Sequence, residues 1–192
     1  MRIAHITATF PPYQGGTGTV CYHNARELAR LGHDVHVFTA GVAGAQAEET
    51  MEGVHVHRLS PVFRLGNAPF LPRLLNIKGL DLIHLHNPFI FGAEMIRVVS
   101  ALRRIPFVLT HHNDLIGNDY RKPLFNIYRF LTSRFIFYGA SLVLVVTKDH
   151  AQNSVHSQLF KSLEKKLVEL SDGVDINIFS RVGTGDKCKF GL

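Results

Sequence analysis

The chain alternates short apolar runs with longer amphipathic stretches. Runs rich in β-branched residues at 2–8, 35–39, 54–59, 82–86, 107–110 and 142–146 predict strands. Residues 19–31 place apolar side chains at helical spacing, and Gly32 predicts where that helix ends. Helical stretches separate most of the other strands. Strands that are apolar on both faces and alternate with helices predict an α/β fold, a Rossmann-like, doubly wound parallel sheet with helices on both faces.

Distinctive polar segments follow three of the predicted strands. Residues 9–19 form a glycine-containing loop that leads into a helix, where free backbone N–H groups favour a phosphate. Residues 84–88 (HLHNP) and 110–114 (THHND) follow the fourth and fifth strands. Because the carboxyl ends of parallel strands share one edge of a sheet, we expect the three segments to meet in one crevice. The alternative is that these loops are polar only because they are solvated.

Composition indicates a single soluble domain. The chain has 192 residues, 46% of them apolar and 19% charged, and a domain commonly has ~100 to 200 residues. No apolar run reaches the ~18 residues that cross a bilayer, and the opening MRIAHIT predicts a strand rather than a signal peptide. The cysteines, Cys21 and Cys188, are too few for a disulfide framework. A cytoplasmic location is therefore expected.

The charge balance indicates a surface that attracts anions. The net charge is +6 and the pI is near 9.5, which suits nucleoside diphosphates, acidic lipid headgroups or nucleic acid. The basic residues are spread along the chain without a dense tract or zinc-finger spacing. This distribution argues against nucleic acid as a partner.

Three other kinds of site are disfavoured. A dinucleotide site expects a glycine where Cys21 stands and a carboxylate at the end of the second strand, where residues 39–41 read TAG. Histidine pairs such as His84 and His86 lack a recognisable third ligand, so no metal is expected. The sequence also has no G-x-S-x-G elbow, which argues against a serine hydrolase.

Four segments together resemble the N-terminal domain of family 4 retaining glycosyltransferases, which adopt the GT-B fold. These segments are residues 2–39 (RIAHITATFPPYQGGTGTVCYHNARELARLGHDVHVFT), 81–88 (DLIHLHNP), 106–115 (PFVLTHHNDL) and 172–179 (DGVDINIF). The resemblance implies that residues 1–180 are the N-terminal Rossmann-like domain and that residues 181–192 begin the interdomain linker. The C-terminal, donor-binding domain of such enzymes is then absent from this chain.

The resemblance also implies a set of site residues. The donor is expected to be a nucleoside-diphosphate sugar, a UDP- or GDP-sugar, with no metal or other cofactor. The glycine loop of the family closes over the donor diphosphate, a role that falls on Gly15, Gly16 and Gly18. The family histidine that touches the donor sugar near the reacting carbon matches His112, the expected catalytic residue. Acceptor contacts are expected from Tyr13, Gln14, Asn87, His111 and Asp114.

The implied activity is transfer of a hexose to a sugar or lipid-linked acceptor, with retention, in glycan biosynthesis. The leaving phosphate itself accepts the acceptor's proton, so stabilising the diphosphate is the main task of the protein. The family's basic pair and E-x7-E element belong to the C-terminal domain, so this chain is expected to be inactive without that domain or a donor-binding partner subunit. The alternative is a non-catalytic acceptor-binding or partner-binding subunit that completes a two-chain transferase.

Two basic, aromatic segments suggest peripheral contact with the anionic inner face of a membrane. They are residues 58–78 and 121–138. In the second segment Leu124, Tyr128, Leu131 and Phe135 follow helical spacing, which favours packing against the sheet instead.

Overall fold

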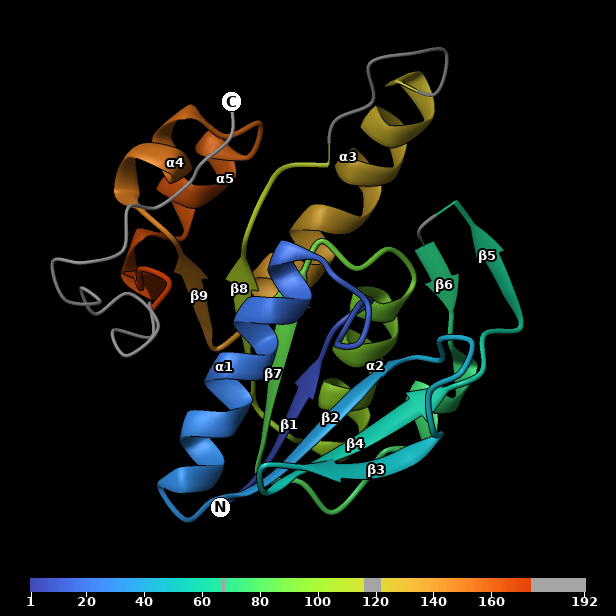
Figure 1. The fold of residues 1–192 in the computed structure, drawn as a ribbon. Helices are drawn as coiled ribbons and strands as arrows, with labels where there is room; N and C mark the ends of the chain where they lie inside the picture. The colour runs from blue at the N-terminus through green and yellow to red at the C-terminus, as the bar shows by residue number, and fades with distance from the viewer. Residues whose placement is uncertain (67, 116–121, 174–192) are drawn as a thin grey trace, which may run out of the picture.

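The computed structural model describes residues 1–66, 68–115 and 122–173, and it confirms the predicted doubly wound sheet (Figure 1). The strands of the main sheet are β1 (Arg2–Ile6), β2 (Asp34–Ala40), β3 (Glu48–Met51), β4 (Val54–Leu59), β7 (Leu82–Asn87), β8 (Phe107–His111), β9 (Leu142–Val145) and β10 (Leu167–Glu169). Their order in space is β10-β9-β8-β7-β1-β2-β4-β3. All neighbours are parallel except β3, which pairs antiparallel with β4.

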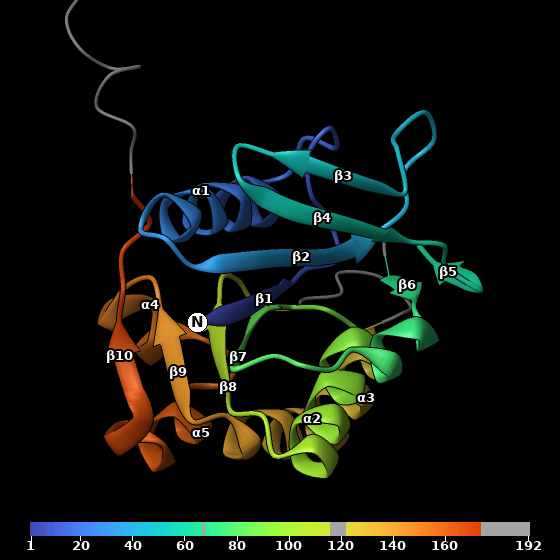
Figure 2. The ribbon, with the colours of Figure 1, turned by 90° about the horizontal axis from the view of Figure 1, so that it is seen from below.

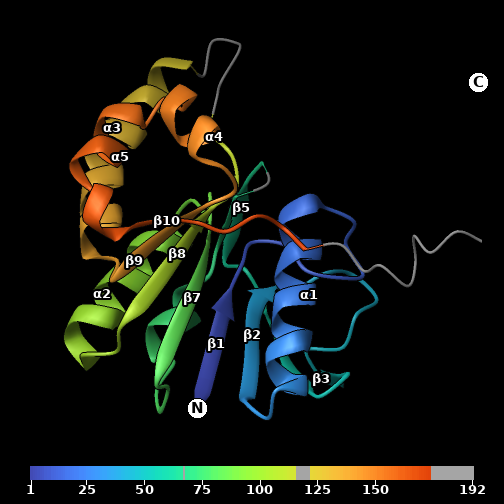
Figure 3. The same ribbon diagram turned by 90° about the vertical axis from the view of Figure 1, so that its left-hand side faces the viewer.

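Helices cover both faces of this sheet, as expected for parallel strands joined by crossovers. They are α1 (Gly16–Arg30), α2 (Gly92–Arg103), α3 (Lys122–Gly139), α4 (Lys148–Asn153) and α5 (Ser157–Ser162), with 3-10 turns η1 (Pro72–Asn76) and η2 (Glu164–Lys166). Figures 2 and 3 place α1 on one face and α2 and α3 on the other.

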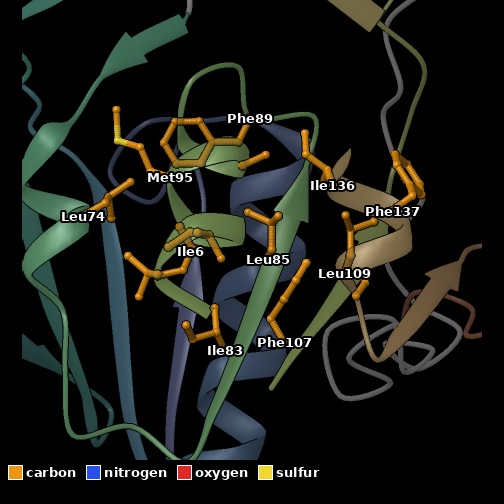
Figure 4. Packing of buried hydrophobic residues seen from close by; sticks show 14 of the residues in the cluster. Ile6, Leu74, Ile83, Leu85, Phe89, Met95, Phe107, Leu109, Ile136 and Phe137 are labelled. Carbon is orange, nitrogen blue, oxygen red and sulfur yellow. The ribbon is translucent and has the colours of Figure 1, made fainter. Parts of the chain in front are cut away.

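The two faces of the central strands differ in chemistry. Toward α2 and α3 the strands point apolar side chains into a large core (Figure 4), which includes Ile6, Ile83, Leu85, Phe107, Leu109, Ile136 and Phe137. Side chains alternate along a strand, so the neighbouring positions point toward α1. There the same strands carry buried polar residues, among them His5, His84, His86 and Thr110.

The sequence missed three small pieces of sheet. β3 is a polar edge strand of sequence EETM, β10 has three residues, and β5 (Phe63–Leu65) and β6 (Ala68–Phe70) form a separate antiparallel hairpin. Such short or edge strands bury little apolar surface, so their patterns resemble those of loops. The predicted domain exit and linker, from residue 174 onward and including Cys188, lie outside the described residues.

The predicted packing face of α3 is only partly right, since Tyr128 is partly buried and donates to Glu94 but two other predicted residues are exposed. Leu131 and Phe135 are 66% and 46% exposed, whereas Ser133, Ile136 and Phe137 face the core. A helix of this composition has apolar residues on more than one side, so periodicity alone did not fix which side is buried.

Part of the first basic segment is buried in the fold, whereas Phe63 and Leu65 of the same segment are 49% and 59% exposed. Contact of this segment with a membrane stays a prediction. Arg58 is buried, pairs with Glu49 and donates to the carbonyl of Pro11 at 2.6 Å. Leu71 and Leu74 are fully buried. Within the described part of the chain, no helix combines the length and the apolar character needed to span a membrane.

Gly18 fixes how α1 leaves the loop after β1. It is buried, and a Cβ added there would lie 2.7 Å from the carbonyl oxygen of Thr9 and 3.2 Å from the Cα of Phe10. A Cβ added at Gly16 would meet nothing within 4 Å. The two glycines therefore differ in whether the backbone tolerates a side chain.

We expect Gly18→Ala to lower the free energy of unfolding by about 1–3 kcal/mol, because α1 must shift away from Thr9. The matched control Gly16→Ala should leave it unchanged or raise it by up to about 1 kcal/mol, the helix-propensity gain of alanine. Urea denaturation of both variants measures the difference. Equal effects would contradict the close packing at Gly18.

Candidate active site

The polar segments 84–88 and 110–114 begin inside β7 and β8 rather than after them, because these strands reach Asn87 and His111. Their last residues lie side by side at the carboxyl edge of the sheet, as the sequence predicted. The backbone N–H of His112 donates to the carbonyl of Asn87 at 3.0 Å. β1 is the next neighbour of β7 in the sheet, so the loop that follows β1 starts from the same edge. His112 is partly exposed at this edge.

Two imidazoles connect His112 to the centre of the sheet. Nε2 of His112 lies 2.9 Å from Nδ1 of His86, and Nε2 of His86 lies 3.0 Å from Nδ1 of His5. His84, beside them, bonds through Nε2 to the Thr110 hydroxyl at 2.7 Å. These side chains come from β1, β7, β8 and the loop after β8, so the hydrogen bonds tie neighbouring strands together on the α1 side.

Burial keeps these rings neutral. It lowers the pKa of His5 to about 4, and burial with the neighbouring His111 lowers the pKa of His112 to about 4. The pKa values of His84 and His86 are held well below 6.5, by burial first and by neighbouring histidines second. Near neutral pH, His112 therefore presents a neutral imidazole.

His111 and Asp114 form a second cluster, whose hydrogen bonds hold a loop in place. His111 is buried; Asn87 Nδ2 donates to its Nδ1 at 3.2 Å, and its Nε2 donates to Asp114 Oδ1 at 3.1 Å. The Asp114 carboxylate also accepts from the Ser154 hydroxyl at 2.7 Å and the Val155 N–H at 2.9 Å. These bonds hold the loop after β8 against the turn between α4 and α5.

The hydrogen bonds of Asp114 also set its charge. Burial alone would raise the pKa of this carboxyl group, but the bonds from His111, Ser154 and the Val155 amide hold it well below its usual range. Asp114 is therefore a carboxylate at neutral pH. Most of the polar side-chain atoms of Asn87, His111 and Asp114 already bond within the protein. Contacts of these residues with an acceptor stay predictions.

The amino end of α1 is free of side-chain caps. Gly15 is the N-cap residue, no side chain caps this end, and the first turn has no acidic residue. The first N–H groups of a helix have no partner within it, so this end suits an anion. Gly16 is exposed there, whereas Gly18 is buried against Thr9.

The other residues of this loop are on the surface. Tyr13 and Gln14 are exposed, and the Tyr13 ring lies against Gly15. The predicted roles of these residues toward donor and acceptor remain predictions.

The sequence did not single out His5 or link Cys21 to the histidines. The Sγ of Cys21 and one nitrogen each of His5 and His86 lie within 4.8 Å of one another, and all three residues are fully buried. Burial raises the pKa of the Cys21 thiol well above its usual range. The hydrogen bond between His5 and His86 occupies one nitrogen of each ring. The absence of a metal requirement stays a prediction.

The family profile described as Glycosyltransferase Family 4 matches residues 14–177, most of the chain. The chain belongs to glycosyltransferase family 4. It is 31% identical over 130 residues to an uncharacterized glycosyltransferase of Methanocaldococcus jannaschii, covering 61% of this chain and 32% of that protein. It is also 31% identical over 126 residues to the MMP alpha-(1->4)-mannosyltransferase of Mycolicibacterium hassiacum, covering 61% and 30%.

Solved structures with the same fold include other glycosyltransferases. Sucrose-phosphate synthase from Thermosynechococcus elongatus superposes with a TM-score of 0.68 at 15% identity, over 92% of this chain and 49% of that one. Anabaena HepE in complex with UDP-glucose gives 0.62 at 19% identity, over 93% and 46%. These matches confirm the fold expected for the N-terminal domain of a family 4, GT-B glycosyltransferase. The chain spans about a third of the curated relatives and about half of these structures.

Because its buried histidines are neutral, we expect this family 4 domain to lose stability as soon as the pH falls below neutral. Unfolded histidines bind a proton near pH 6.5, but His5, His112 and His156 bind it only near pH 4 when folded, because burial disfavours their charged form. The unfolded state therefore holds more protons, and the free energy of unfolding falls as the pH drops from about 6.5 to about 4.

Each of these three histidines should remove about 1 kcal/mol of stability between pH 7 and pH 5.5. Urea denaturation at several pH values measures the slope. Stability that stays flat down to pH 5 would contradict the neutral, buried state of these rings.

Proposed function

We propose that the protein carrying this chain transfers a hexose from a nucleoside-diphosphate sugar, a UDP- or GDP-sugar, to a sugar or lipid-linked acceptor with retention. The chain supplies the acceptor-side domain. The observation that carries the proposal is a neutral, partly exposed His112 at the same sheet edge from which the uncapped glycine loop of α1 departs. The UDP-glucose bound to HepE supports a nucleotide sugar as the donor.

Each part of the edge has a task in this reaction. The free N–H groups around Gly15 and Gly16 stabilise negative charge on the departing diphosphate. His112 contacts the donor sugar near the reacting carbon. A neutral ring suits that position, since a positive charge there would oppose an oxocarbenium-like transition state. The leaving phosphate takes the proton of the acceptor hydroxyl, so no protein base is required.

The remaining catalytic groups belong to a second domain or to a partner subunit. This chain spans about a third of its curated relatives, and the nucleotide and most of the donor are held elsewhere in the proposed enzyme. The chain alone is then inactive. A non-catalytic, acceptor-binding subunit is the competing outcome of the experiment below.

In the natural protein that carries this chain, His112→Ala should lower kcat by about 10²- to 10³-fold, the usual effect of removing one transition-state contact. The matched control His55→Ala removes a half-exposed histidine from β4 and should keep full activity. Transfer rates with a panel of UDP- and GDP-sugars measure the effect, and thermal unfolding checks that both variants fold.

Product stereochemistry, read by NMR of the glycosidic linkage, tests retention. Full activity of His112→Ala would overturn the role of this residue. Absence of transfer by the natural protein, together with tight binding to a separate donor-binding chain, would instead establish the non-catalytic subunit.

The exposed side of α3 supports membrane contact as a second property. Ile127, Phe130 and Leu131 are 58%, 73% and 66% exposed, and Arg134 follows at the same helical spacing, so apolar and basic groups share one stripe. Such a stripe suits the surface of an anionic bilayer, where a lipid-linked acceptor would lie.

The double variant Phe130→Ser/Leu131→Ser should lose most binding to vesicles that contain anionic lipid, measured by co-sedimentation at low salt. The control Leu102→Ser removes a 79% exposed leucine from α2 and should bind like the unchanged protein. If the unchanged protein fails to sediment with the vesicles, or if both variants behave alike, α3 is not a membrane surface.

A further inference from the structure

His112 is the outer end of a chain of three hydrogen-bonded imidazoles. The links are 2.9 Å from His112 Nε2 to His86 Nδ1 and 3.0 Å from His86 Nε2 to His5 Nδ1. The inner end of the chain, Nε2 of His5, is buried and has no hydrogen-bond partner among the described residues. The outer end, Nδ1 of His112, is the nitrogen left for a ligand.

The proton positions on the three rings are coupled. A neutral imidazole carries hydrogen on one nitrogen and a lone pair on the other, and each link needs one hydrogen. Two arrangements satisfy both links. In the inward arrangement every ring donates toward His5, and His112 offers a lone pair at Nδ1. In the outward arrangement every ring donates toward the carboxyl edge of the sheet, and His112 offers an N–H at Nδ1.

The surroundings of His5 favour the outward arrangement. The inward arrangement would leave a buried N–H at His5 Nε2 without an acceptor, and unpaired buried N–H groups are rarer than under-satisfied acceptors. The outward arrangement leaves a lone pair instead.

His84 and Thr110, which lie beside these rings on the same face, do not decide between the two arrangements. His84 Nε2 is occupied by the Thr110 hydroxyl, and the ring of His84 stacks on that of His86 with centroids 4.3 Å apart. A hydroxyl both donates and accepts, so this bond is compatible with either arrangement.

We propose that His5 and His86 are positioning residues that place the proton of His112 on Nδ1, so that His112 presents an N–H donor to an oxygen of the bound ligand. Isolated histidine side chains prefer the proton on Nε2. The three bonded rings of His5, His86 and His112, called the relay below, would therefore reverse the ordinary proton position of His112. The identity of that ligand as the donor sugar rests on the proposed function; the proton position does not.

The proton position is read from two-bond ¹H–¹⁵N correlation spectra of the chain labelled with ¹⁵N-histidine, near pH 7 and without substrate. The signals of His112 are identified by their loss in His112→Gln. The expected pattern is a protonated Nδ1 and a bare Nε2. A His112 that carries its proton on Nε2 overturns the proposal.

Variants then test which residues hold the proton in place. His5→Phe removes the inner ring and should return His112 to the Nε2-protonated pattern, whereas the control His23→Gln, on α1 outside the relay, should leave it unchanged. An unchanged pattern in a folded His5→Phe overturns the role of His5. Should His5→Phe not fold, the unaltered protein still decides the proposal.

Kinetics separate this inference from the transfer reaction. In the natural protein, His5→Phe should lower kcat by about tenfold or more with little change in KM, since a hydrogen bond that orients the donor sugar for reaction acts mainly in the transition state. An unchanged kcat would overturn the functional part of the relay. Failure of transfer in the natural protein would refute the proposed function and leave the measured proton position intact.

Discussion

The site depends on burying imidazoles without charging them. His5, His84 and His86 lie in the layer between the parallel sheet and α1, where an unpaired polar group would be costly. Neutral rings that hydrogen-bond to one another and to Thr110 satisfy most of that requirement. The same bonds connect β1, β7 and the loop after β8. His112 is therefore held by the interior of the domain, although it lies at the edge of the sheet.

The two faces of the sheet have different roles: one carries the main apolar core, and the other carries the buried polar side chains that lead to the candidate site. On the α2 and α3 face, Ile83, Leu85, Phe107 and their neighbours form a continuous apolar core. On the α1 face the same strands present histidine and threonine, and Cys21 of α1 lies near His5 and His86. Strand alternation gives each strand a share in both layers. The apolar core thus supports a polar layer that ends at His112 on the carboxyl edge of the sheet.

The sequence was sufficient for the fold and for the location of the candidate site. Strong β-branched runs and the glycine loop identified the parallel sheet and the edge where residues 84–88 and 110–114 meet. It could not reveal the bonds from His112 to His86 and from His86 to His5, because these pairs are 26 and 81 positions apart and only the strand pairing brings them together. The buried side of α3 was also misjudged, since Leu131 and Ile136 are equally apolar in a sequence. The edge strand β3 was not predicted from the sequence, because its residues do not form an apolar run.

In the proposed function, the amino end of α1 contacts the diphosphate of a nucleotide-sugar donor and His112 contacts its sugar. A crystal structure of the natural protein with the nucleotide sugar that binds it most tightly tests this claim directly. We expect diphosphate oxygens within hydrogen-bond distance of the backbone N–H groups at Gly15 or Gly16, and the sugar in contact with the His112 ring. A donor bound away from the amino end of α1, with His112 facing only solvent, would contradict it.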